Sequence, residues 1–205
     1  MENMLILLFC LVTLIGEVKS RVSSHIKVIV WQGVLLFLIF IFDSSSAPLV
    51  SIVFIAIEVL LIRAIIIPII LKRILGSTDS HFESEHRISS FYSLLIMALL
   101  FISGFFFAYI ANKTFSGISP LQLGMSISTI LMGLYLILIR KKMISHIMGY
   151  VIMENGILLL SFSLLGDMPL LISVGVLIDF FIGILLFRYY TLKIFQNGYD
   201  KRGRI

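Results

Sequence analysis

The stretch SHIMGYVIMENGILLLSFSLL, residues 145–165, decides the fold class of this chain. It is apolar over about 20 residues, the length that an α-helix needs to cross the hydrocarbon core of a bilayer. Glu154 and Asn155 lie side by side near its middle. Charge at that depth is expensive, since insertion scales give about +2.5 to +3.5 kcal/mol for an Asp, Lys or Arg at a helix centre. A membrane helix that keeps such a residue is expected to use it.

The same apolar character extends along the whole chain. Of its 205 residues 60% are hydrophobic and 13% are charged, and the mean hydropathy is +1.12. A soluble domain has about 25% charged residues. Apolar stretches of about 20 residues recur with short polar connections, which is typical of several spanning helices. The sequence therefore predicts an all-α, polytopic membrane protein.

Seven spanning helices are expected, over residues 3–18, 26–42, 48–71, 90–111, 120–139, 145–165 and 168–188. The first range has an acidic start without basic residues, so it is predicted to be a retained helix and not a signal peptide. A division after residue 112 separates a four-helix part, 1–112, from a three-helix part, 113–205.

The basic residues predict the orientation of these helices. Fourteen of the 16 Lys and Arg residues lie after the first, third and fifth ranges or at the C-terminal end, and Lys113 lies alone on the other side. Basic residues collect on the cytoplasmic side of membrane proteins. We expect the N-terminus outside and the C-terminus in the cytoplasm, in the inner membrane of a prokaryote. The net charge of +5 follows from these loops, so a nucleic acid partner is not expected.

Four ionisable residues lie well inside the predicted helices: Glu58 and Arg63 in the third, Glu154 in the sixth and Asp179 in the seventh. Function is the default interpretation of such residues. The short connection GDMP makes the sixth and seventh helices antiparallel neighbours, which places Glu154 and Asp179 at similar depth. Two carboxyl groups in that position can exchange protons, directly or through water, as a proton relay requires.

Small residues recur at regular spacing in these two helices. Gly149 and Gly156 are seven residues apart in the sixth, and Gly175 and Gly183 flank Asp179 at four-residue spacing in the seventh. Small residues let a second backbone approach closely. We expect both sets to pack against neighbouring helices.

The third helix carries both an acid and a base. Five α-helical positions separate Glu58 from Arg63 by about 140°, so they are not expected to pair. Arg63 is expected either to lie on an ion path, beside the kink that Pro68 produces, or to reach a carboxylate of a partner subunit. Structural roles stay open for both, because polar side chains also tie membrane helices together, for about 0.6 kcal/mol per hydrogen bond. Asn155 and Gln32 suit such ties at mid-depth.

No pattern indicates a cofactor or metal held by this chain. Cys10 is the single cysteine, and the histidines His25, His81, His86 and His146 lie in or near the predicted cytoplasmic connections. Neither an iron–sulfur cluster nor a haem between the helices is therefore expected. A phosphate-binding loop and a nucleophile–base set are also missing from the sequence. These observations predict a non-catalytic subunit.

Two segments, IMGYVIMENGILLL (147–160) and ISVGVLIDFFIGILLF (172–187), resemble the hydrogenase-4 component E family. Those proteins are membrane subunits of formate-hydrogenlyase-type and other group 4 energy-converting hydrogenases. EVKSRVSSHIKVIVWQGVLLF (17–37) and LLIRAIIIPIIL (60–71) fit the same family, so the resemblance covers nearly the whole chain. The pattern G-Y-x-x-M-E-N-G is its best marker.

The last three predicted helices also resemble the K (4L) subunit of respiratory complex I and the C subunit of multisubunit cation/proton antiporters. That subunit carries one buried glutamate in each of its last two helices. Asp179 falls on the second of these acids, whereas Val151 falls on the first. Glu154 lies three residues further along roughly the same helix face.

The resemblance implies a place in a redox-driven ion pump. Its partners would be antiporter-like membrane subunits, a subunit like the H subunit of complex I, and a hydrogenase-like peripheral arm holding the nickel–iron centre and the iron–sulfur clusters. In this interpretation Glu154, Asp179, Glu58 and Arg63 form part of an intramembrane proton relay. Two alternatives stay open: a cation/proton antiporter subunit without a redox partner, and a structural spacer between antiporter-like subunits.

Overall fold

The computed structural model describes residues 2–18, 22–43, 53, 57–69, 71–72, 90–114, 119–139, 143–164, 175, 178 and 183. This part of the chain contains six helices and no strand, so the predicted all-α class is confirmed for it. The helices are α1 (Glu2–Val18), α2 (Val22–Asp43), η1 (Ile57–Ile66), α5 (Ser90–Thr114), α6 (Pro120–Ile139) and α7 (Met143–Leu164).

Four helical stretches are long and apolar enough to cross a membrane: residues 25–42, 91–113, 120–139 and 145–164. α1 contains a shorter apolar stretch, Asn3–Leu14. The chain therefore has the character of a multi-pass membrane protein, and the four stretches coincide with predicted ranges. The total of seven spans and the sides of the termini stay predictions. Most of the seventh range, 168–188, lies outside the described residues.

Local sequence explains where α6 begins. Proline is favoured at the first position of a helix, because its missing N–H would have no partner there. Pro120 occupies that position, and the N–H of Leu123 donates to the carbonyl oxygen of Ser119 at 3.0 Å, which closes the first turn. In apolar surroundings without water, the backbone N–H and C=O groups must hydrogen-bond with each other, so the following residues continue as helix.

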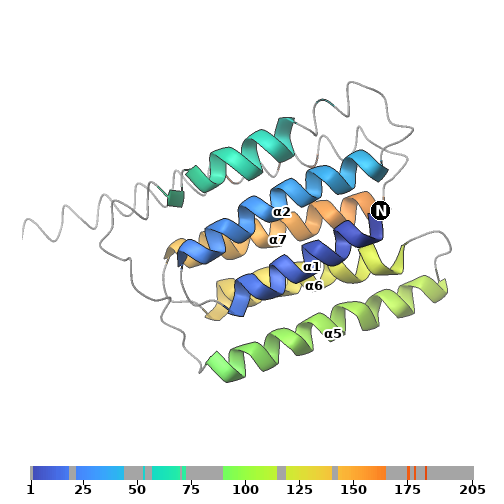
Figure 1. Ribbon diagram of the computed structural model, residues 1–205. Coiled ribbons are helices and arrows are strands. Elements are labelled where there is room, and N and C mark those ends of the chain that lie inside the picture. The colour runs from blue at the N-terminus through green and yellow to red at the C-terminus, as the bar shows by residue number, and fades with distance from the viewer. Residues whose placement is uncertain are drawn as a thin grey trace, which may run out of the picture.

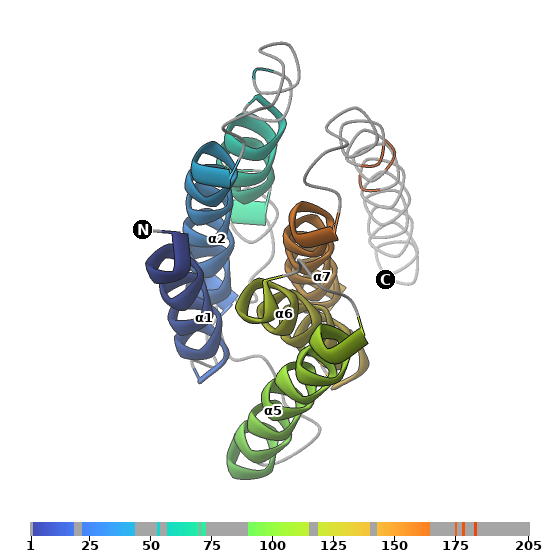
Figure 2. The same ribbon diagram turned by 90° about the vertical axis from the view of Figure 1, so that its right-hand side faces the viewer.

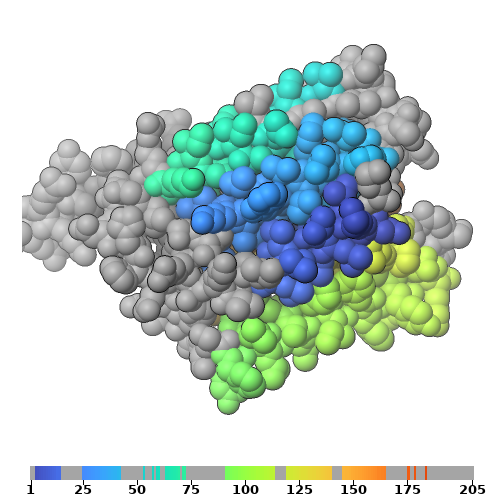
Figure 3. Space-filling model, viewed as in Figure 1, coloured from blue at the N-terminus to red at the C-terminus, as the bar shows by residue number. Residues whose placement is uncertain are grey.

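The helices form two rows that pack against each other (Figures 1 and 2). In one row α2 lies between α1 and η1, and in the other α6 lies between α5 and α7. The rows meet where α2 packs against α7 and α1 against α6. One broad face of the molecule consists of η1, α2 and α1 with α5 beyond them, as the space-filling view in Figure 3 shows. α7 therefore packs against α6, the helix before it, and against α2, which is distant in sequence.

Glycines bring α6 and α7 into close contact. A Cβ atom added at Gly133 would lie 2.5 Å from the backbone nitrogen of Met153 and 2.7 Å from the carbonyl oxygen of Gly149. One added at Gly156 would lie 2.8 Å from the backbone nitrogen of Ile130. The two backbones therefore touch, in the way that small residues permit in membrane helix pairs.

Polar groups tie α5 to α6. The hydroxyl of Tyr135 donates to the Ser93 hydroxyl oxygen at 3.0 Å, and the Ser128 hydroxyl lies 3.0 Å from the carbonyl oxygen of Phe101. α5 thus joins α6 across the division predicted after residue 112.

The third predicted helix departs from α-helical winding. Residues Ile57–Ile66 form a π-helix, in which each N–H bonds five residues back. The expected 140° between positions 58 and 63 assumed 3.6 residues per turn and is therefore wrong. In a π-helix position 63 follows position 58 after about one turn. Pro68, which lies just beyond the π-helical residues and is buried, cannot donate a backbone hydrogen bond.

Candidate functional site

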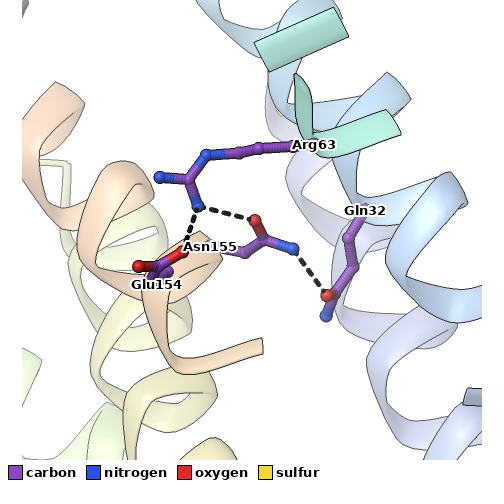
Figure 4. A network of polar contacts seen from close by, with 4 residues as sticks. All are labelled: Gln32, Arg63, Glu154 and Asn155. Carbon is purple, nitrogen blue, oxygen red and sulfur yellow. Dashed lines mark hydrogen bonds and ion pairs between the residues drawn. The ribbon is translucent and has the colours of Figure 1, made fainter. Parts of the chain in front are cut away.

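Four helices contribute polar side chains to one buried layer. Thr13 comes from α1, Gln32 from α2, Arg63 from η1, and Glu154 and Asn155 from α7; Figure 4 shows the last four. The layer is almost sealed from solvent, because the exposed fractions are 0% for Thr13, Gln32 and Asn155, 2% for Arg63 and 5% for Glu154. Residues from four separate segments thus meet in the middle of the helix bundle.

Arg63 is the charged centre of this layer. Its Nη1 atom lies 3.6 Å from Oε2 of Glu154 and donates a hydrogen bond to Oδ1 of Asn155 at 3.1 Å. Because Glu154 and Asn155 are consecutive on α7, one guanidinium nitrogen contacts both (Figure 4). One of the two alternatives for Arg63 placed its carboxylate partner in another subunit, whereas in this structure Glu154 of the same chain lies beside it.

The hydrogen bonds of the layer run in one direction. Nδ2 of Asn155 donates to Oε1 of Gln32 at 3.0 Å, and Nε2 of Gln32 donates to the hydroxyl oxygen of Thr13 at 2.9 Å. The Thr13 hydroxyl donates to the carbonyl oxygen of Phe9 at 2.8 Å. Arginine has donors only, so Asn155 must turn its oxygen toward Arg63, which fixes the orientation of each following group.

Two apolar clusters enclose the layer along the helix axes. On one side lie residues such as Phe9, Leu36, Val59, Leu158 and Phe162. Phe9 and Val59 precede Thr13 and Arg63 in their helices. Leu36 follows Gln32, and Leu158 and Phe162 follow Glu154. The cluster on the opposite side is made by Ile26, Ile29, Leu71, Leu136, Met148, Val151 and Ile152. The polar layer is therefore separated from both ends of the bundle by packed hydrocarbon.

The other predicted residues are placed unevenly. Gly149 and Gly156 lie at the contact with α6. Gly175 is exposed and Gly183 is half-buried, and a Cβ added at either would meet no atom within 4 Å, so the described residues show no close contact there. Asp179 lies outside the described residues, as does the side chain of Glu58. The predicted exchange between Glu154 and Asp179 is therefore not tested.

Sequence reasoning missed Thr13 and the pairing of Arg63 with Glu154. A signal for the pairing was present, because a buried arginine in a membrane needs an anion within reach. Three acids in the predicted helices could have met that need. The choice among them required the packing of η1 on α2 and of α2 on α7, which no local pattern reveals. Thr13 had no signal beyond being a polar residue in an apolar helix.

Comparisons with known proteins give one distant relative. No family model matches the chain, and no solved structure does. The chain is 23% identical over 177 residues to the uncharacterized protein Rv0085 of Mycobacterium tuberculosis, covering 86% of this chain and 80% of that protein. A similar sequence therefore extends over most of the length, but it carries no function to compare.

The chemistry of the layer follows from its members. Arginine keeps its proton in proteins, and carboxamides and hydroxyls do not ionise at ordinary pH. Glu154 is therefore the titratable acid among these five residues, beside a fixed positive charge. Within the described residues no group of three His, Cys, Asp or Glu side chains could hold a metal ion.

Proposed function

We propose that this chain is a non-catalytic membrane subunit of a complex-I-like, group 4 hydrogenase-type ion pump, in which it carries part of an intramembrane proton relay. The observation that carries the proposal is the buried ion pair between Arg63 of η1 and Glu154, which lies in the middle of α7. The acid belongs to the G-Y-x-x-M-E-N-G segment, the best marker of the resemblance to the hydrogenase-4 component E family.

Stability alone is a weak reason for this pair. Apolar residues of similar volume often replace a buried ion pair without loss of stability, because desolvation offsets the attraction between the charges. The layer is also surrounded by apolar residues that would accommodate such a replacement. Function is therefore the stronger explanation for keeping the charges.

The geometry supports movement of charge across the bundle. Since packed hydrocarbon lies on both sides of the layer along the helix axes, Glu154 is poorly placed for a channel that crosses the membrane through these helices. A proton on Glu154 removes the anion beside Arg63 and leaves a net positive charge there. An antiporter-like subunit packed beside this one would sense that change, because charges interact strongly at low dielectric.

The structural spacer is the second candidate, and the amide chain favours it. Asn155 and Gln32 join α7 to α2, and Thr13 extends the tie to α1. In the spacer interpretation Arg63 and Glu154 add one more tie between η1 and α7, and no proton moves. Replacement of both charges together would then leave ion transport unchanged.

A double substitution separates the two functions. The intact complex is purified from its native membranes, its subunits are identified, and redox-driven acidification is measured in proteoliposomes. We expect Arg63→Gln/Glu154→Gln to assemble and to lose at least 10-fold in translocation. Wild-type translocation by the double variant would refute the relay and favour the spacer. Identified partners without nickel–iron and iron–sulfur subunits would refute the redox pump and indicate a cation/proton antiporter.

A further inference from the structure

The chain of side chains beyond Arg63 ends within this subunit. From Asn155 the hydrogen bonds pass to Gln32, to Thr13 and finally to the carbonyl oxygen of Phe9. All three side chains are fully buried, and each one donates a hydrogen bond to the next acceptor. A backbone carbonyl accepts a hydrogen bond but has no proton to pass on.

This chain is poorly suited to proton transfer. A proton moves along a hydrogen-bonded chain when each member accepts one proton and releases another. A carboxamide does so only through a high-energy imidic acid form, because its nitrogen donates and its oxygen accepts. Arg63, at the head of the chain, keeps its own proton.

We propose that Asn155, Gln32 and Thr13 close the polar layer toward α1, and that Asn155 and Gln32 hold Arg63 beside Glu154, so that Glu154 exchanges its proton on the side of α7 away from α1. Asn155 is then a positioning residue, and Gln32 holds it by accepting a hydrogen bond from its Nδ2 atom. This inference rests on the proposed relay, since it states from which side the relay reaches Glu154.

The first test asks whether protons pass through Thr13, the last side chain of the path toward α1. Thr13→Val removes the hydroxyl group at similar volume, and translocation is measured in the reconstituted complex beside Glu154→Gln. We expect Thr13→Val to stay within twofold of wild type while Glu154→Gln loses at least 10-fold. A 10-fold loss in Thr13→Val, in an assembled complex, would overturn the inference and leave the relay intact. Normal translocation by Glu154→Gln would instead refute the relay.

The second test asks whether Asn155 positions Arg63. Dicyclohexylcarbodiimide reacts with protonated carboxyl groups in apolar surroundings, so its rate of reaction at Glu154, followed by mass spectrometry, reports on that carboxyl. We expect Asn155→Leu to change this rate at least threefold, because Arg63 is then no longer held in position beside Glu154. Thr13→Val is expected to leave the rate within 1.5-fold of wild type. General loosening of the bundle would instead change the rate in both variants. Equal rates in wild type and Asn155→Leu would contradict the positioning role.

An independent observation concerns the outward side of α5. Large apolar side chains protrude from it, namely Leu94, Leu95, Leu99, Ile102, Phe106 and Phe107, whereas Ser93, Met97, Gly104 and Ala108 are buried. Small residues favour helix–helix contact in membranes, and α5 turns three of them inward. The outward side consists mostly of large apolar side chains, with Ala98 as an exposed small residue among them.

Aromatic residues mark both ends of this side. Tyr92 and Tyr109 are exposed, and Nζ of Lys113 lies 4.7 Å from the centre of the Tyr109 ring. Tyr109 follows Tyr92 by 17 positions, which span about 26 Å of α-helix, close to the hydrocarbon thickness of about 30 Å. Tyrosines at both edges of an apolar helix are typical of the two membrane interfaces.

We infer that the outward side of α5 contacts lipid in the assembled complex, with Tyr92 and Tyr109 at the two interfaces. The test uses single-cysteine variants in a Cys10→Ser background, spin-labelled in the complex in lipid nanodiscs. Labels at Leu99→Cys and Ile102→Cys are expected to relax at least threefold faster with oxygen than a label at Ala108→Cys. Equal protection at all three sites would show that a protein subunit covers α5.

Discussion

Arg63 and Glu154 lie 91 positions apart in the chain, yet Nη1 of Arg63 is 3.6 Å from Oε2 of Glu154. Removal of one partner leaves the other charge buried, which typically costs about 3–5 kcal/mol. We therefore expect Glu154→Leu alone to lower thermal stability in detergent strongly. The double variant Arg63→Met/Glu154→Leu is expected to recover most of the loss. Equal melting temperatures for the single and double variants would contradict the pairing.

The contact between Gly133 and Met153 predicts a site that cannot accept a methyl group. A Cβ added at Gly133 would lie 2.5 Å from a backbone nitrogen, which cannot rotate away. Gly133→Ala is therefore expected to destabilise the bundle by about 1–3 kcal/mol, as overpacking does. Gly175→Ala is the matched control, because a Cβ there meets no atom of the described residues within 4 Å. A larger effect at Gly175, measured by thermal unfolding in detergent, would contradict this packing.

Much of the helical organisation could be predicted from composition. A spanning helix requires an apolar stretch of about 20 residues, and this requirement is visible in the chain itself. The predicted ranges 90–111, 120–139 and 145–165 lie within a few residues of α5, α6 and α7.

The candidate site was predicted as separate residues and not as a cluster. Glu154, Asn155, Arg63 and Gln32 stood out because polar groups are rare at mid-membrane. Their meeting depends on which helices are neighbours and on the π-helical winding of residues 57–66. Both properties arise from tertiary packing, whereas the prediction applied α-helical geometry to each segment alone.

Tyr135 provides a test of the tie between α5 and α6. Its hydroxyl donates to the buried Ser93 side chain at 3.0 Å. Tyr135→Phe removes this bond without changing the ring, and interhelical hydrogen bonds in membranes average about 0.6 kcal/mol. We expect a small loss of stability, below about 1 kcal/mol, and unchanged ion translocation. A large loss of translocation in this variant would indicate that the proton path runs between α5 and α6.

Gly33 controls how closely α2 approaches η1 beside the polar layer. A Cβ added at Gly33 would lie 3.0 Å from Cβ and 3.1 Å from Cα of Ala64, the residue after Arg63. Gly33→Val is therefore expected to push η1 outward and to lengthen the contact between Arg63 and Asn155. The expected result is a change of at least threefold in the rate at which dicyclohexylcarbodiimide modifies Glu154. Gly183→Val is the control, because a Cβ added at Gly183 meets no atom of the described residues within 4 Å. It should leave that rate within 1.5-fold of wild type. Equal rates in both variants would show that the spacing of α2 and η1 does not control the site.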